Sequence, residues 1–241
     1  MTRSAVFIPR FRVIYTMLFG TRAQAIAASK QLYQRHTGIC GELPQGRHYE
    51  ANEVAALLWV YATLVESAIL AYDFVLPPLL SAEREQYYAE SKRMSALFGI
   101  PAEALPESWS AFVEYTAEMV DSSQLYVDST AFALSRSVLS GAGTWVRPPH
   151  WYQALTAHWM PPRLRAAFAL NLSAPETQAV DRAARWLPRL YPHLPGRLRF
   201  VAPFHEAEAR LRGHAPGFLT RESNRFWMGQ PRLLYAELSG I

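Results

Sequence analysis

Residues 21–38, TRAQAIAASKQLYQRHTG, decide the class of fold. Thr21 and Gln24 have the spacing of a capping box, in which each side chain accepts a hydrogen bond from the backbone of the other residue. Gly38 is typical of the residue at which a helix ends, because glycine adopts the left-handed conformation without strain. The sequence therefore predicts a helix from Thr21 to about His36.

The same start and stop signals recur along the chain, whereas no segment shows a convincing strand alternation. A second long helix is expected from Asn52, as its N-cap, to about Phe74. Further helices are expected near 81–99, 107–122, 128–140, 149–159, 162–170, 175–187 and 204–212. We therefore expect an all-α protein that folds as a single domain over residues 1–241.

One face of the predicted helix 21–36 is narrow and ends in a histidine. At 100° per residue, four side chains fall within about 80° of one another: Ala25, Ala28, Leu32 and His36. The histidine has two interpretations. It is either a core residue hydrogen-bonded to a neighbour or the ligand of a metal or haem iron, because an imidazole projecting into an apolar slot suits iron.

The second long helix carries a polar seam along one face, made of Trp59, Thr63, Glu66, Leu70 and Asp73. Glu66 is either paired with an arginine or a hydroxyl, because an isolated buried carboxylate is costly, or it is a general base. Nothing near it in the sequence supports the second alternative.

Composition excludes several classes of protein. The net charge is +4, and the 24 basic residues do not gather in one run, so no nucleic-acid partner is expected. The single cysteine, Cys40, excludes an internal disulfide. No secretory signal is predicted, because Pro9, Arg10 and Arg12 break the apolar N-terminus. No transmembrane segment is predicted, because Glu66 interrupts the most apolar stretch, and the expected location is cytoplasmic.

Common catalytic motifs are incomplete. SGAG at 140–143 has no nucleophile between its glycines, and GAGTWV lacks the third glycine of a dinucleotide-binding fingerprint. FHEAEAR at 204–210 begins like a zinc-protease helix, but Ala209 stands where the second histidine is needed. The sequence therefore gives no support to a hydrolase, a nucleotide-binding enzyme or a zinc protease.

Four ordered segments resemble the MpaB/latex-clearing oxygenase family. HTGICG at 36–41 is similar to that family's H-x-x-V-x-G element, and QGRHYEAN at 45–52 is similar to its D-G-R-x-Y-x-A-N-D turn. WVYATLVES at 59–67 and PLLSAEREQYYAE at 78–90 resemble the next two elements. Later segments, MPPRLRAAFAL and LPGRLRFVAPFHEAEARLRG, also look like the family, so the resemblance covers about residues 19–213.

The resemblance implies a globin-like helical core with additional helices that holds haem b. Family members studied as oxygenases use dioxygen to cleave carbon–carbon double bonds of isoprenoid chains. The histidine of the first element is the proximal iron ligand there, and it falls on His36 here. The implied partners are therefore dioxygen and an apolar, isoprenoid-like substrate.

Two departures from the family pattern stand out. Tyr61 occupies the position of the histidine in W-V-H-A-T-L. The family's distal arginine and threonine, four residues apart, belong to a segment that we expect to be shortened here. Arg12 and Thr16 have the right spacing but lie too close to His36 for this role. The catalytic residues therefore stay unassigned, and a non-catalytic helical module that binds an apolar ligand or a protein partner is the alternative to an oxygenase.

Overall fold

The computed structural model describes residues 8–42, 46, 48–142 and 148–233. These residues form twelve α-helices, a few short 3-10 turns and one pair of three-residue strands. The prediction of an all-α protein is therefore confirmed. The backbone divides into two compact units, each built from separate segments of the chain. The prediction of one domain over residues 1–241 remains a prediction, since the division by itself does not show whether the units fold together.

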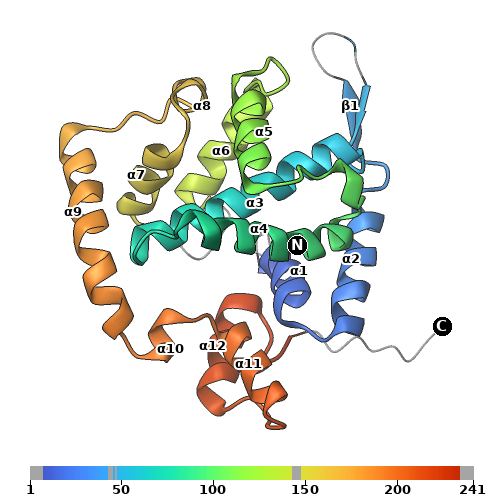
Figure 1. Ribbon diagram of the computed structural model, residues 1–241, viewed down its shortest axis with the longest axis vertical. Helices are drawn as coiled ribbons and strands as arrows, with labels where there is room; N and C mark the ends of the chain where they lie inside the picture. Colours follow the sequence, from blue (N-terminus) through green and yellow to red (C-terminus); the bar gives the residue numbers. More distant parts are fainter. Residues whose placement is uncertain (1–7, 43–45, 47, 143–147, 234–241) are drawn as a thin grey trace. The chain divides into compact units, whose positions relative to one another are not determined.

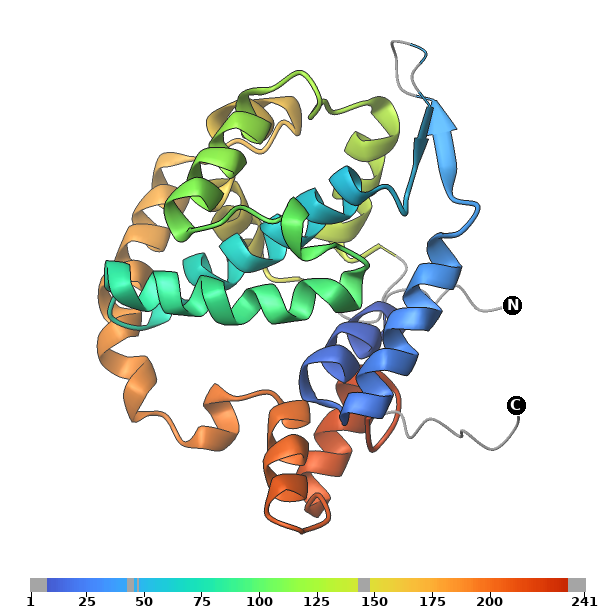
Figure 2. The same ribbon diagram turned by 45° about the vertical axis from the view of Figure 1, so that its right-hand side comes forward.

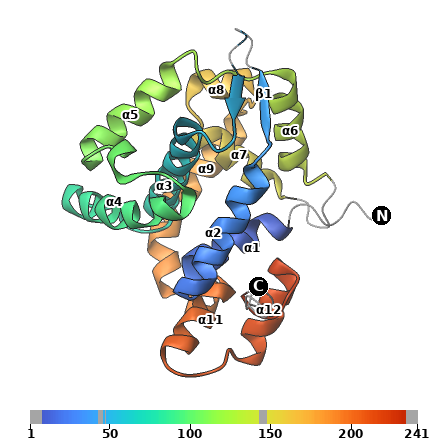
Figure 3. The same ribbon diagram turned by 90° about the vertical axis from the view of Figure 1, so that its right-hand side faces the viewer.

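Unit 2 contains residues 8–61, 91–105 and 194–233 within the described ranges. Helix α1 (Ile8–Phe19) packs against α2 (Arg22–His36), and also against α11 (Ala202–Leu211) and α12 (Phe218–Met228). The turn between α11 and α12 lies at the end of this unit farthest from the strand pair (Figure 3). Val13 and Met17 of α1 are buried together with Ala25 and Ala28 of α2. Small alanines let the two helices approach closely.

An antiparallel strand pair follows α2 in unit 2, with β1 (Cys40–Glu42) against β2 (His48–Glu50) (Figure 2). It was not predicted, because three residues are too few to show alternation. The short α10 (Gly196–Arg199) and the 3-10 turns η2 (Ala96–Phe98) and η3 (Ala102–Ala104) complete this unit.

Unit 1 contains Ala62–Glu90 and Pro106–His193, and the boundary between the units falls within α3 (Val54–Val75) and α4 (Ser81–Ser95). Its other elements are α5 (Trp109–Asp121), α6 (Ser129–Ser140), α7 (His150–Trp159), α8 (Pro162–Ala167), α9 (Ala174–Leu190) and the 3-10 turn η4 (Tyr191–His193) (Figure 1). Helix α7 packs against α9 and α5 against α8. The guanidinium of Arg163 donates hydrogen bonds to three carbonyls at the end of α5, those of Val120, Ser122 and Leu125.

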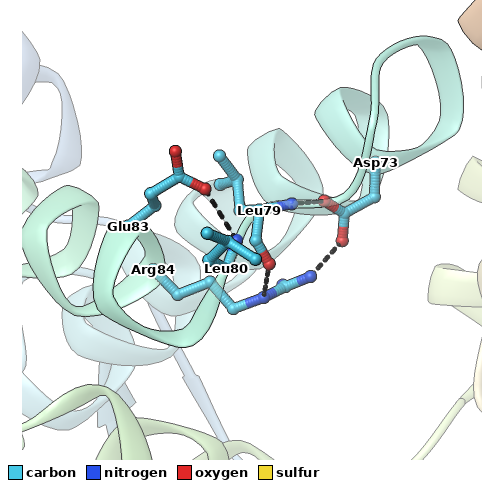
Figure 4. A network of polar contacts seen from close by, with 5 residues as sticks. All are labelled: Asp73, Leu79, Leu80, Glu83 and Arg84. Atoms are coloured by element: carbon cyan, nitrogen blue, oxygen red, sulfur yellow. Dashed lines mark hydrogen bonds and ion pairs between the residues drawn. The ribbon is translucent and has the colours of Figure 1, made fainter.

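The turn between α3 and α4 is held by an ion pair (Figure 4). Asp73 lies 2.5 Å from the guanidinium of Arg84 and accepts the backbone N–H of Leu79 at 3.1 Å. Arg84 also donates to the carbonyl of Leu79, and Glu83 accepts the N–H of Leu80. The acidic end of the predicted polar seam on α3 is therefore structural.

Helix α3 is, among the described residues, the one helix long and apolar enough to cross a membrane. A third of its most apolar window, 33%, is buried inside the protein. The core helix of a water-soluble protein meets the same criteria of length and composition. The prediction that the chain has no transmembrane segment therefore stays a prediction.

Most predicted helices lie where the sequence placed them. The helix expected to end at Gly99 is α4 continued to Phe98 by η2, with Gly99 at a φ of +77°. Helices α1, α10 and α12 were not predicted. Asn52 was predicted as the N-cap of α3. Instead, the carbonyl of Glu53 accepts the first helical hydrogen bond, from Leu57.

Candidate functional site

Helix α2 is fixed at both ends by the residues that predicted it. The backbone N–H of Gln24 donates to the Thr21 hydroxyl at 3.2 Å, and the N–H of Thr21 donates to the Gln24 amide oxygen at 2.8 Å. At the other end the chain leaves the helix at Thr37 and turns at Gly38, whose φ is +83°. These ends set the length of the helix and so place His36 in its last turn.

The predicted stripe of α2 runs from the core to an open cavity. Ala25 and Ala28 are buried, whereas Leu32 and His36 are half-buried and line the cavity. No described residue forms a hydrogen bond or ion pair with the His36 imidazole. The structure therefore does not show the hydrogen-bonded core histidine that was one of the two interpretations, and both ring nitrogens are available to a ligand.

The strand pair turns the chain back toward the end of α2. Gly41 lies opposite Tyr49 in the register, and a Cβ atom at position 41 would lie 2.7 Å from the Tyr49 ring. A larger residue at position 41 would displace the Tyr49 ring, because real Cβ atoms do not approach other atoms so closely. The backbone N–H of Ala51 then donates to the carbonyl of Ile39 at 2.9 Å. The chain thereby returns to the residues that follow His36.

Asn52 joins this returning segment to α2. Its amide nitrogen donates to the carbonyl of Tyr33 at 3.2 Å and to the hydroxyl of Thr37 at 3.4 Å. Its amide oxygen is buried and accepts no hydrogen bond from any described residue. Asn52 and His36 both line the cavity. The amide oxygen of Asn52 and the imidazole of His36 therefore lie on the same cavity, and neither is hydrogen-bonded to a described residue. The sequence interpretation as a helix cap missed this role.

The opposite wall of the cavity comes from η2. The hydroxyl of Ser29 on α2 donates to the carbonyl of Leu97 at 2.6 Å and holds η2 against the helix. Phe98 is part of this wall and is largely buried, with its ring centroid 5.3 Å from that of Tyr61. The enclosed space has a volume of about 260 Å³, and its walls are mostly apolar. We call it the His36 cavity.

A second cavity of about 440 Å³ lies in unit 1, bounded by α7, α8 and the start of α9. His158, Arg165, Asn171 and Thr177 line it, so its rim is more polar. His158 is exposed at the end of α7. The His36 cavity is therefore the better candidate for an apolar ligand held by one imidazole.

Comparison with known families shows which family the chain belongs to. A family model described as "ER-bound oxygenase mpaB/B'/Rubber oxygenase, catalytic domain" matches residues 10–190. The chain belongs to this family. No curated protein and no solved structure matches the chain significantly. The match confirms the resemblance inferred from the sequence and supports an oxygenase, an enzyme that brings dioxygen and a substrate together.

In this MpaB/rubber oxygenase member, Tyr61 is a core residue. Its side chain is buried, and its hydroxyl donates to the carbonyl of Ser91 in α4. Its ring packs on Phe98, behind the His36 cavity, and Tyr61 does not itself line that cavity. The phenol thus holds α3 and α4 together at the position where the family pattern has histidine.

Arg12 and Thr16 of the family member lie one turn apart on α1. The Thr16 hydroxyl is buried and donates to the carbonyl of Arg12 at 2.8 Å, within the same helix. The Nε atom of Arg12 is buried without a hydrogen-bond partner among the described residues. Neither residue lines the His36 cavity.

Glu66 lies half-buried on α3, in unit 1, and burial raises the pKa of its carboxyl above the usual value. The pairing with an arginine or a hydroxyl that was one prediction is not found with any described residue. Its neighbour on the seam, Asp73, forms the ion pair instead. No described histidine, cysteine or carboxylate lies with Glu66 in a group of three or more that could hold a metal.

The incomplete zinc-protease motif on α11 is structural in this family member. Glu206 is 4% exposed and accepts the amide N–H of Asn224 at 2.7 Å and the backbone N–H of Leu233 at 3.0 Å. Burial raises the pKa of Glu206, and the hydrogen bonds to its carboxylate oppose that shift. His205 lies beside the carbonyl of Gly196 at 3.3 Å. The motif therefore joins α11 to α12 and the segment after it.

Proposed function

We propose that this chain is a haem b-dependent oxygenase that uses dioxygen on an apolar, isoprenoid-like alkene, with His36 as the iron ligand. The observation that supports the proposal is an imidazole on the wall of an apolar cavity that forms no hydrogen bond or ion pair with any residue the structure describes. A cytoplasmic location, which the sequence predicts, is part of the same proposal.

The residues of the His36 cavity fit the chemistry of haem in two respects. One neutral imidazole is sufficient to hold a haem iron, and the remaining walls must be apolar to accept the macrocycle. The orphaned amide oxygen of Asn52 can accept a hydrogen bond from a donor brought into the cavity. Ring nitrogens that bind metals usually leave the other N–H to such an acceptor, which fixes the orientation of the imidazole.

The size of the cavity limits what it encloses. Its volume of about 260 Å³ is slightly below the range of about 300–1,000 Å³ that is usual for pockets enclosing a whole ligand. These walls would therefore enclose only part of a macrocycle held by His36.

Each wall has a separate task in the proposed function. Bound haem supplies the iron at which dioxygen is activated. His36 holds that iron from α2, and the capped ends of α2 keep the imidazole in place. Leu57 and Phe98 line the cavity with apolar atoms, which exclude water and attract an alkene in preference to a polar substrate.

The first experiment is reconstitution of the purified chain with haem, followed by its absorbance spectrum. We expect a Soret band for the unaltered chain and loss of that band in His36→Ala, with recovery when imidazole is added to the solution. His214→Ala, a change at an exposed histidine of the same unit, is the matched control. An unchanged spectrum in His36→Ala would exclude His36 as the ligand.

The second experiment separates an oxygenase from a module that only binds an apolar ligand. Dioxygen uptake by the haem-loaded chain is measured with a polyisoprenoid alkene and with its saturated analogue. Uptake with the alkene alone supports double-bond cleavage. A chain that binds haem through His36 but consumes no dioxygen with either compound supports the binding module.

A further inference from the structure

The net positive charge of the chain is concentrated in one segment. Residues 194–233 contain seven arginines and three glutamates, a net charge of +4. The whole chain has 24 basic and 20 acidic residues, also +4, so the remainder carries 17 of each and is neutral. This segment includes α10, α11 and α12 of unit 2.

The same segment exposes large apolar side chains. Leu211, at the end of α11, is 86% exposed, and Phe218, at the start of α12, is 65% exposed. Both flank the turn that forms the free end of the α11–α12 pair (Figure 3). Leu198 on α10 is also exposed, between Arg197 and Arg199 in the sequence. Arginines therefore flank exposed leucines at two places in this segment, around Leu198 and around Leu211.

Helix α12 turns its apolar face outward. Leu219, Phe226 and Trp227 fall within about 100° of one another on the helix, and all are at least half exposed. The opposite face, which carries Asn224 and Met228, is buried. A helix of a water-soluble protein normally packs its apolar stripe on the core. The exposed stripe of α12 is therefore available to apolar material outside the protein.

We propose that this segment, which we call the α10–α12 surface, binds the surface of a membrane that contains anionic lipids. Amphipathic helices with tryptophan, phenylalanine and leucine on one face lie in the interface of a bilayer, and nearby arginines attract acidic headgroups. A second copy of the chain is the less suitable partner, because it would bring seven arginines against seven others. The proposal does not depend on haem.

The test is co-sedimentation of the full chain with lipid vesicles. We expect binding to vesicles of phosphatidylcholine mixed with phosphatidylglycerol, little binding to pure phosphatidylcholine, and weaker binding as salt is raised. Trp227→Ser should lower the partition coefficient about ten-fold or more, because it removes a large apolar anchor. Arg197→Gln, a change at an exposed arginine beside Leu198, should lower it about five-fold, the equivalent of about 1 kcal/mol for one charge.

The chain offers a matched control in unit 1. Trp186 on α9 is 59% exposed against 55% for Trp227, and it is likewise flanked by arginines, Arg185 and Arg189. Trp186→Ser should leave vesicle binding unchanged. Equal loss in Trp186→Ser and Trp227→Ser, or no preference for anionic vesicles, would overturn the proposal. So would a dimer in solution that Trp227→Ser converts to a monomer, since the surface would then pair two copies.

Discussion

Replacing Glu206 by alanine removes the acceptor that ties α12 and the segment after it to α11. The change leaves the amide N–H of Asn224 and the backbone N–H of Leu233 without their partner, and both residues are almost completely buried. An unsatisfied buried donor costs about 1–3 kcal/mol, so two donors cost about 2–6 kcal/mol. Relief from burying a carboxylate, which burial of Glu206 makes unfavourable, offsets part of this. We expect Glu206→Ala to lower the free energy of unfolding by about 3 kcal/mol.

The assay is urea unfolding followed by circular dichroism, supported by thermal unfolding. For a chain of this length, about 3 kcal/mol corresponds to a fall in Tm of roughly 6–12 °C. Glu208→Ala is the matched control, because Glu208 lies on the same helix and its contacts are an exposed pair with Arg212 and a longer contact, 3.8 Å, with His205. Such a pair contributes at most about 1 kcal/mol. If the two variants differ by less than about 1 kcal/mol, the hydrogen-bonded carboxylate does not hold these elements together.

Three further predictions concern single side chains. Burial raises the pKa of the Glu66 carboxyl, so the protonated carboxyl stabilises the fold below the ordinary pKa, and this stability is lost as pH rises through the raised pKa. The Glu66→Gln variant should therefore unfold at a higher urea concentration than the unaltered chain at about pH 7 but not at about pH 4. Tyr61→Phe should cost about 1 kcal/mol by removing the bond to Ser91, and the spectrum of the haem-loaded chain should not change; a shifted Soret band would mean that the phenol reaches the iron. Arg163→Lys should cost about 1–2 kcal/mol in urea unfolding, because lysine cannot reach three carbonyls as the guanidinium does; no change would mean that the contacts at the end of α5 carry no stability.

The helices could be predicted where local chemistry fixes their ends. Thr21 with Gln24, and Asp128, cap the helices that they were expected to start. Ser108 caps the helix that was expected to start one residue earlier, at Glu107. Helix α12 could not be predicted in this way, because no polar side chain caps its N-terminus and its apolar face is turned outward. Its pattern is periodic, but nothing in the sequence indicates which face meets the core.

The candidate site was predicted only in part, for a physical reason. The narrow face of α2 and its terminal His36 depend on helix geometry alone, so the sequence is sufficient to place them. The other wall depends on contacts between distant residues, such as the bond from Ser29 to Leu97. The role of Asn52 depends on a strand pair too short to show a pattern. For Asn52 the sequence offered one signal, the A-N pair of the family's D-G-R-x-Y-x-A-N-D turn, which matches Ala51 and Asn52.

The bond between Ser29 and Leu97 has a consequence for how the protein is made. The two residues that join the walls of the His36 cavity lie 68 positions apart, so the pocket does not exist until the ribosome has released the chain past Gly99. Until then α2 exposes His36 without the opposite wall of the cavity, which η2 forms. Any cofactor captured at this position must therefore bind after the first 99 of the 241 residues have left the ribosome, and a fragment ending before Ala96 should fail to retain it.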